Sequence, residues 1–144
     1  MNNERQKKSF GAMVAHTKMA IFRRLLHNFK LAGYTITPEQ WQVLIRLFYS
    51  DGICQQELAD FTHRDRPGIT RILDNMEKNN LITRMSQPED RRKKAVYLTE
   101  YGKSLGEKLE ELANTTNAEA LAGIDESELE ICRKVLLSVQ ENLD

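Results

Sequence analysis

Apolar side chains recur every three to four residues along most of the chain, a spacing that predicts a mainly helical fold. The first apolar stripe covers residues 9–32 and stops before Gly33, a residue type that commonly follows the last turn of a helix. Thr37 can cap the next helix, and Gln40 stands three residues later, where its side chain can return a hydrogen bond to the cap. We expect this second helix to run to Tyr49.

The middle of the chain contains shorter segments. Two short helices are predicted over 55–62 and 65–79, joined by a tight turn, and two strands over 81–86 and 95–98. The loop between the strands, residues 87–94, is polar and charged, so the strands should form a hairpin with a protruding tip. Two short helices followed by such a hairpin are typical of a winged helix, which presents its second helix to the major groove of DNA.

The last third returns to helical spacing. Thr99 is expected to cap a long helix that can break at Thr115 and Thr116, and Asp125 or Ser127 to open a final helix. These helices and the first one carry more apolar surface than a small DNA-binding lobe can cover, which favours a two-fold dimer. The residues expected at the dimer interface are Phe10, Met13, Leu136, Val139 and Leu143.

The predicted fold class is therefore mainly α with a small β-hairpin wing. A length of 144 residues suits one structural domain. Within it we expect an N-terminal dimerisation helix in residues 1–36, a winged helix-turn-helix DNA-binding lobe in 37–99 and C-terminal dimerisation helices in 100–144.

The balanced charge, 21 basic against 21 acidic residues, conceals an asymmetry along the chain. Residues 1–60 contain eight basic and five acidic residues, and residues 61–99 contain nine and five, whereas residues 100–144 contain four and eleven. A basic middle beside an acidic tail indicates that the middle meets a polyanion such as DNA.

Several classes of protein are disfavoured. Hydrophobic residues make up 40% of the chain, enough for a folded core. There is no apolar run of membrane-spanning length and no secretory signal at the N-terminus, so we expect a cytoplasmic protein that does not bind a membrane. Cys54 and Cys132 are expected to be reduced thiols. No phosphate-binding glycine loop, nucleophile–base set or metal-ligand spacing occurs, so we expect no catalytic residue, metal or cofactor.

The candidate DNA contacts lie on the second short helix and at the hairpin tip. Four adjacent cations on a protruding tip can neutralise phosphates or enter a minor groove. Arg84, at the base of the hairpin, is interpreted as a structural partner of Asp90, so that both orient the wing. The candidate DNA-binding residues on these two elements are Arg66, Thr70, Arg71 and Asn75, followed by Arg91, Arg92, Lys93 and Lys94.

The motifs of this region resemble those of the MarR (multiple antibiotic resistance regulator) family. The resemblance is carried by Leu58-Ala59, by Thr70-Arg71 followed by Asp74 and Met76-Glu77, by Asp90-Arg91-Arg92, and by Leu98-Thr99 with Gly102. It implies a homodimeric transcriptional regulator with a recognition helix at 65–79 and a wing at 86–95. Its dimer would form from the first helix and the last two.

The resemblance also implies roles for single residues. Arg92 would enter the minor groove, and Asp90 would orient the wing through ion pairing. Many relatives release DNA when a small aromatic or anionic effector binds between the dimer arms and the DNA-binding lobe. This chain departs from the family pattern at two places. Cys54 replaces the usual hydroxyl residue that caps the helix before Leu58-Ala59, and Pro67-Gly68 replaces a Ser-Thr pair early in the recognition helix. We still expect Pro67 and Gly68 to lie against DNA.

These patterns favour a sequence-specific double-stranded DNA-binding regulator, acting as a ligand-responsive repressor on a pseudo-palindromic operator. Two alternatives stay open. One is a thiol-based redox sensor on the same scaffold, with Cys54 as the reactive group. The other is a winged-helix protein–protein interaction module that does not bind DNA.

Overall fold

The computed structural model describes residue 4 and residues 9–144. The predicted segment 1–36 is therefore seen only in part, and the expectation about a secretory signal lies mostly outside the described residues. The elements in chain order are α2 (Phe10–Leu31), α3 (Pro38–Tyr49), β1 (Ile53–Cys54), α4 (Gln55–Phe61), α5 (Arg66–Lys78), β2 (Ile82–Ser86), β3 (Lys94–Leu98), α6 (Glu100–Ala120) and α7 (Glu126–Leu143). The three strands form an antiparallel sheet in the order β1-β3-β2. The predicted fold class is confirmed, and the helices and strands expected between residues 9 and 98 begin and end within two residues of their expected positions.

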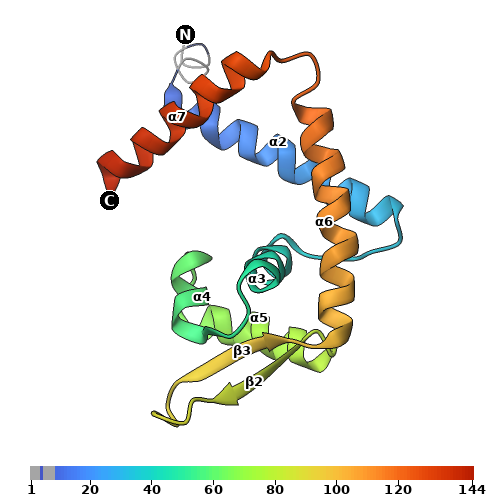
Figure 1. The fold of residues 1–144 in the computed structure, drawn as a ribbon, viewed down its shortest axis with the longest axis vertical. Helices are drawn as coiled ribbons and strands as arrows, with labels where there is room; N and C mark the ends of the chain where they lie inside the picture. Colours follow the sequence, from blue (N-terminus) through green and yellow to red (C-terminus); the bar gives the residue numbers. More distant parts are fainter. Residues whose placement is uncertain (1–3, 5–8) are drawn as a thin grey trace.

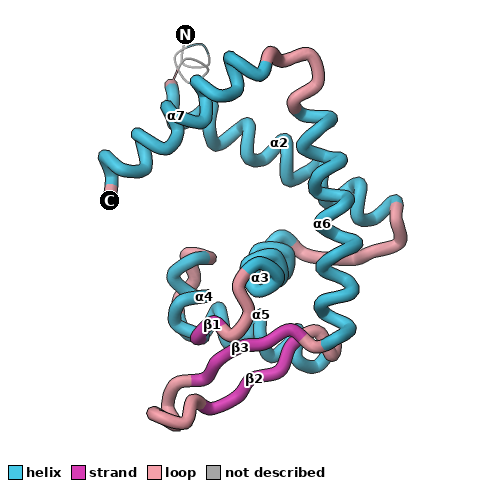
Figure 2. Tube along the Cα trace, viewed as in Figure 1, coloured by secondary structure: helices cyan, strands magenta, loops and turns pink. Residues whose placement is uncertain are grey.

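Helices α3, α4 and α5 and the sheet form a lobe around one apolar core (Figures 1 and 2). The capping box predicted at Thr37 is present: the Gln40 amide N–H donates to Thr37 Oγ1 at 3.1 Å, and the Thr37 N–H donates to the Gln40 side chain at 3.1 Å. The core is filled by fully buried side chains from each helix, among them Leu44, Leu58 and Leu73. Its apolar content follows from the three- and four-residue spacing in each helix.

Helix α6 leaves the lobe and is crossed by α2 beyond it, whereas α7 follows α6 after a loop and extends away from it (Figure 1). The expected break at Thr115 and Thr116 does not occur: the helix continues to Ala120, and each threonine hydroxyl donates to the carbonyl four residues earlier, as threonines inside helices commonly do. Thr116 is buried and accepts a hydrogen bond of 2.9 Å from Asn28 on α2. The hydrogen bond from Asn28 thus joins α2 to α6 at the position where the sequence predicted a break.

Helix α7 has no buried residue, and the apolar side of α2 is also open near its start. Phe10 is 49% exposed, Met13 56% and Leu143 82%, while Leu136 is 37% exposed and Val139 is half-buried. Large exposed apolar surfaces of this kind in a folded chain mark an interaction surface.

None of the helices formed by the described residues is both long and apolar enough to cross a membrane.

Candidate nucleic-acid interface

Helix α5 carries two distinct faces. Asp65 caps it by accepting the Gly68 amide N–H at 2.8 Å, and the missing N–H of Pro67 costs nothing in the first turn. Ile69, Leu73 and Met76 are buried against the lobe. The opposite face is open, and a shallow surface hollow on it is lined by Arg66, Pro67, Thr70, Arg71 and Asp74. The helix predicted at 65–79 thus presents a polar outer side.

A tight turn sets the angle between α4 and α5. His63 adopts a left-handed conformation at φ 54°, which is uncommon for a residue other than glycine. The buried hydroxyl of Thr62 donates to the Leu58 carbonyl at 2.8 Å, which secures the end of α4. Arg64 then pairs with Glu39 of α3 at 2.8 Å. These bonds hold the start of α5 against both preceding helices.

The wing is a regular hairpin whose tip is organised by its own backbone. Asp90 accepts the Arg92 amide N–H at 3.0 Å, and the Asp90 carbonyl accepts the Lys93 N–H at 3.0 Å. Gln87 closes the loop by donating to the Lys93 carbonyl at 2.9 Å. Asp90 therefore shapes the turn that presents Arg91 and Arg92, through hydrogen bonds to the main chain.

The predicted pairing of Arg84 with Asp90 is wrong. Arg84 instead folds back onto the recognition helix, where its guanidinium bonds Asp74 at 2.5 Å and Glu77 at 3.1 Å. The reason is geometric: β2 runs beside α5 (Figure 1), so acids on that helix are within reach, while Asp90 lies in the loop that joins β2 to β3. The pKa of the Glu77 carboxyl is lowered, mainly by its hydrogen bond with Arg84. Arg84 thus joins the base of the wing to α5.

A concave groove of about 710 Å³ lies between α4, α5 and the wing. Its cationic lining is Arg66, Arg84, Arg92, Lys93 and Lys94. Arg84 is neutralised by its two acids, but within the part of the chain that the structure describes, none of the other four forms an ion pair with a carboxylate. Unpaired cations on a concave surface attract a polyanion and can displace its counterions.

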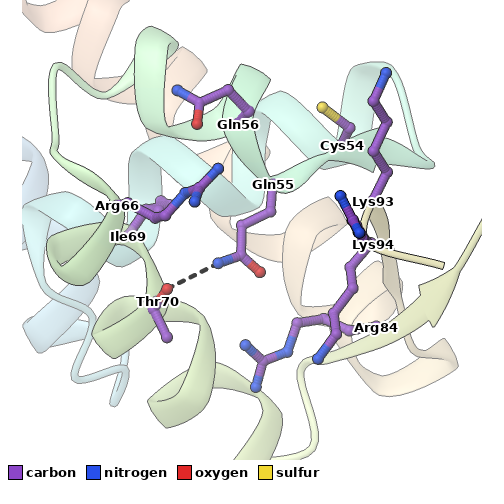
Figure 3. A pocket seen from close by; sticks show the side chains of 10 residues that line it. Cys54, Gln55, Gln56, Arg66, Ile69, Thr70, Arg84, Lys93 and Lys94 are labelled. Carbon is purple, nitrogen blue, oxygen red and sulfur yellow. Dashed lines mark hydrogen bonds between the residues drawn. The ribbon is translucent and has the colours of Figure 1, made fainter. Parts of the chain in front are cut away.

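Two of the predicted DNA contacts on α5 have partners inside the protein. The Asn75 amide oxygen accepts from Gln40 at 2.8 Å and from Asn79 at 3.1 Å, so this side chain connects α5 to the start of α3. The Thr70 hydroxyl accepts a hydrogen bond of 2.8 Å from Gln55, the first residue of α4. Figure 3 shows Gln55 reaching across the groove to Thr70, with Arg66 and the wing lysines around them.

Gln55 is a groove residue that the sequence did not single out. A glutamine in the first turn of a short helix is unremarkable by itself, and only the packing of α4 on α5 brings it to Thr70, fifteen residues away. Cys54 precedes it and lines the same groove; as the sequence predicted, its side chain makes no capping hydrogen bond to α4. No group of three or more His, Cys, Asp or Glu side chains suited to a metal ion occurs among residues 4 and 9–144.

Comparisons with known proteins agree on one family. A model of the MarR family matches residues 36–94, the lobe and most of the wing. The transcriptional regulator PA3341 is 34% identical, with a TM-score of 0.84, and the match covers 94% of this chain and 98% of that one. A MarR family transcriptional regulator from Listeria monocytogenes, solved in complex with a 26mer DNA, is 27% identical, with a TM-score of 0.83 and coverage of 94% and 89%.

Proposed function

Because this chain belongs to the MarR family of transcriptional regulators, whose members are DNA-binding proteins rather than enzymes, we propose that it is a homodimeric repressor that a small molecule releases from DNA. The observation that carries the proposal is the groove between α5 and the wing, in which four cations have no acidic partner within the described residues. The complex of the Listeria relative with DNA supports the same assignment.

The shape of the lobe suits double-stranded DNA. One helix fills a major groove about 12 Å wide, and the outer face of α5 carries Arg66, Thr70 and Arg71 for that contact. The wing would then follow the backbone, with Arg92 reaching the neighbouring minor groove and Arg91, Lys93 and Lys94 contacting phosphates. Pro67 and Gly68 would lie in the first turn of α5 where it approaches the sugar–phosphate backbone of the DNA. Asn75, already bonded to two side chains, is left out of this contact set.

Dimerisation accounts for the exposed apolar faces of α2 and α7. A second copy packed on Phe10, Met13, Leu136 and Leu143, with the half-buried Val139 at the edge, would cover them. The two recognition helices would then read half-sites about 10 bp apart on a pseudo-palindromic operator. Residues 37–99 would serve as the DNA-binding lobe, and the segments on either side would form the dimer.

The effector we propose is a small aromatic or anionic molecule bound between the arms and the lobe. Such a ligand can release DNA only to the extent that it prefers the spacing of the recognition helices that does not fit the operator. A regulator of this kind must have access to chromosomal DNA, so we propose that it is a cytoplasmic protein.

Selection of bound duplexes from random DNA, followed by titrations at several salt concentrations, tests the proposal. Arg92→Ala should weaken binding to every sequence and lower the salt slope by about one unit, because one cation that displaces counterions from the duplex is lost. Arg71→Ala should cost about 1–3 kcal/mol and relax preference at one base pair. Lys108→Ala, exposed on α6, is the control and should bind as the wild type does.

Two outcomes would redirect the assignment. Failure of the wild type to enrich any duplex would indicate a winged-helix module that binds protein instead of DNA. Loss of DNA binding on peroxide treatment that Cys54→Ser prevents would favour the thiol sensor, a candidate kept because Cys54 lies in the cationic groove itself.

A further inference from the structure

Thr70 differs from the other threonines that lie inside helices. Thr17, Thr115 and Thr116 each donate their hydroxyl to the carbonyl four residues earlier, at 2.8, 3.1 and 2.8 Å. This is the usual position of a threonine hydroxyl in a helix. Within the described part of the chain, Thr70 makes no such bond; its oxygen instead accepts the Gln55 amide at 2.8 Å. Thr116 also accepts an amide, from Asn28, and still donates to its own backbone, so the bond from Gln55 marks a hydroxyl at Thr70 that lies away from the helix backbone.

The direction of this hydrogen bond has a chemical consequence. A hydroxyl has one proton to donate and two lone pairs to accept with. When one lone pair is used by Gln55 and the proton is not used by the Arg66 carbonyl, the proton is free to point into the groove. Thr70 is half-buried there and has Arg66 beside it (Figure 3). The free proton suits an acceptor on DNA.

We infer that Gln55 is a positioning residue for DNA recognition, which holds the Thr70 hydroxyl as a hydrogen-bond donor toward the duplex. This inference rests on the proposed function. The acceptor is either a phosphate oxygen or an acceptor on a base edge in the major groove, such as purine N7 or the O6 of guanine. Without Gln55, the Thr70 hydroxyl rotates back to the carbonyl of Arg66 and the donor is lost, although Thr70 itself is unchanged.

A double-mutant cycle on the duplex that the wild type selects from random DNA tests this pairing. Thr70→Val keeps the shape and removes the hydroxyl; Gln55→Met keeps the length and removes the amide. Each should weaken binding about two- to tenfold, the range of one neutral hydrogen bond. The double variant should bind no more weakly than Thr70→Val, because Gln55 acts through the hydroxyl. Additive losses, or no loss in Gln55→Met, would overturn the inference.

Further measurements separate positioning from a general loss of structure. The salt slope should stay at the wild-type value in all three variants, since no charge is removed. In Thr70→Ser the hydroxyl remains, so Gln55→Met should still weaken binding in that background; indifference there would contradict the mechanism. Gln42→Met, half-buried on α3 and outside the groove lining, is the matched control and should bind as the wild type does.

The identity of the acceptor follows from the pattern of loss. If the Thr70 proton meets a base, Thr70→Val and Gln55→Met relax preference at the same single base pair. If it meets a phosphate, both variants lose the same factor on every sequence. Relaxation at different base pairs would contradict a shared contact. Absence of any selected duplex with the wild type would refute the proposed function itself, which distinguishes that failure from failure of this inference.

Discussion

Replacing Gly102 by alanine would add one methyl group where α6 leaves the winged-helix lobe. Gly102 is buried, and its N–H donates to the cap residue Thr99 at 2.9 Å. The carbonyl of Leu81, at the start of the wing, crosses directly beside it. An added Cβ would lie 2.2 Å from that oxygen. An ordinary contact between carbon and oxygen is about 3.3–3.6 Å, so α6 and the backbone of Leu81 would have to separate by about 1 Å.

The energy of that separation can be bounded from the structure. Overpacking of a filled site costs about 1–3 kcal/mol. The shift would also disturb the bond from the Thr99 N–H to the Leu81 carbonyl, now 3.0 Å, worth about 1 kcal/mol. Alanine in place of glycine in a helix returns about 0.5–1 kcal/mol. The last two effects nearly cancel, so Gly102→Ala should lower the free energy of unfolding by about 1–3 kcal/mol.

Urea unfolding at a fixed protein concentration measures this difference, because the stability of a dimer depends on concentration. Gly11→Ala in α2 is the control: nothing lies within 4 Å of the Cβ it would add, so it should be neutral or stabilise the chain. A Gly102→Ala protein as stable as the wild type would refute the reasoning, since the contact that demands glycine would then be absent.

Three further predictions concern the wing, acid stability and assembly. Arg84→Met should lower the free energy of unfolding in urea by only about 1 kcal/mol, because the side chains of Asp74 and Glu77 are 59% and 43% exposed and become hydrated. The same substitution should weaken DNA binding, because the wing is no longer held to α5. Unchanged DNA affinity would contradict this. Arg84 holds the pKa of Glu77 below its ordinary value of 4.5, so on acidification Glu77 is protonated at a higher pH in the unfolded chain than in the folded one, and this stabilisation is lost as the pH falls below about 4.5. Glu77→Gln should therefore lose less stability on acidification than the wild type. Parallel curves of stability against pH would rule out a stabilising pair of Arg84 and Glu77. The wild type should scatter light as a dimer and Leu136→Glu as a smaller species; a wild-type monomer at micromolar concentration would exclude the proposed dimer.

Local signals in the sequence were sufficient for most of the elements and their ends, although the break expected at Thr115 and Thr116 is absent. The capping box at Thr37 and the cap at Thr99 each depend on residues within a few positions of one another, and each is present in the structure. The exposed cations of the wing also follow from the sequence, because a polar loop between two strands has no core to enter. The comparisons confirm both the fold class predicted from the spacing of apolar residues and the family that the motifs resemble.

Contacts between elements were beyond the reach of that reasoning. Arg84 had acids available at several separations along the chain, and only the placement of β2 beside α5 selects Asp74 and Glu77 over Asp90. Asn75 lies on the polar side of its helix, but the approach of α3 joins it to Gln40. A side chain on the polar surface of one helix can bond a neighbouring helix in the assembled lobe, and periodicity within a helix does not reveal which side chains do so.

The order of elements, their caps and the positive charge of the wing were thus determined by the sequence alone, since each depends on neighbours along the chain. Tertiary packing decided which polar side chains form hydrogen bonds and ion pairs with one another. These interactions act over a few ångströms, and only packing brings together residues as distant in sequence as Gln55 and Thr70. The hydrogen bond from Gln55 to Thr70 across the groove belongs to that second group.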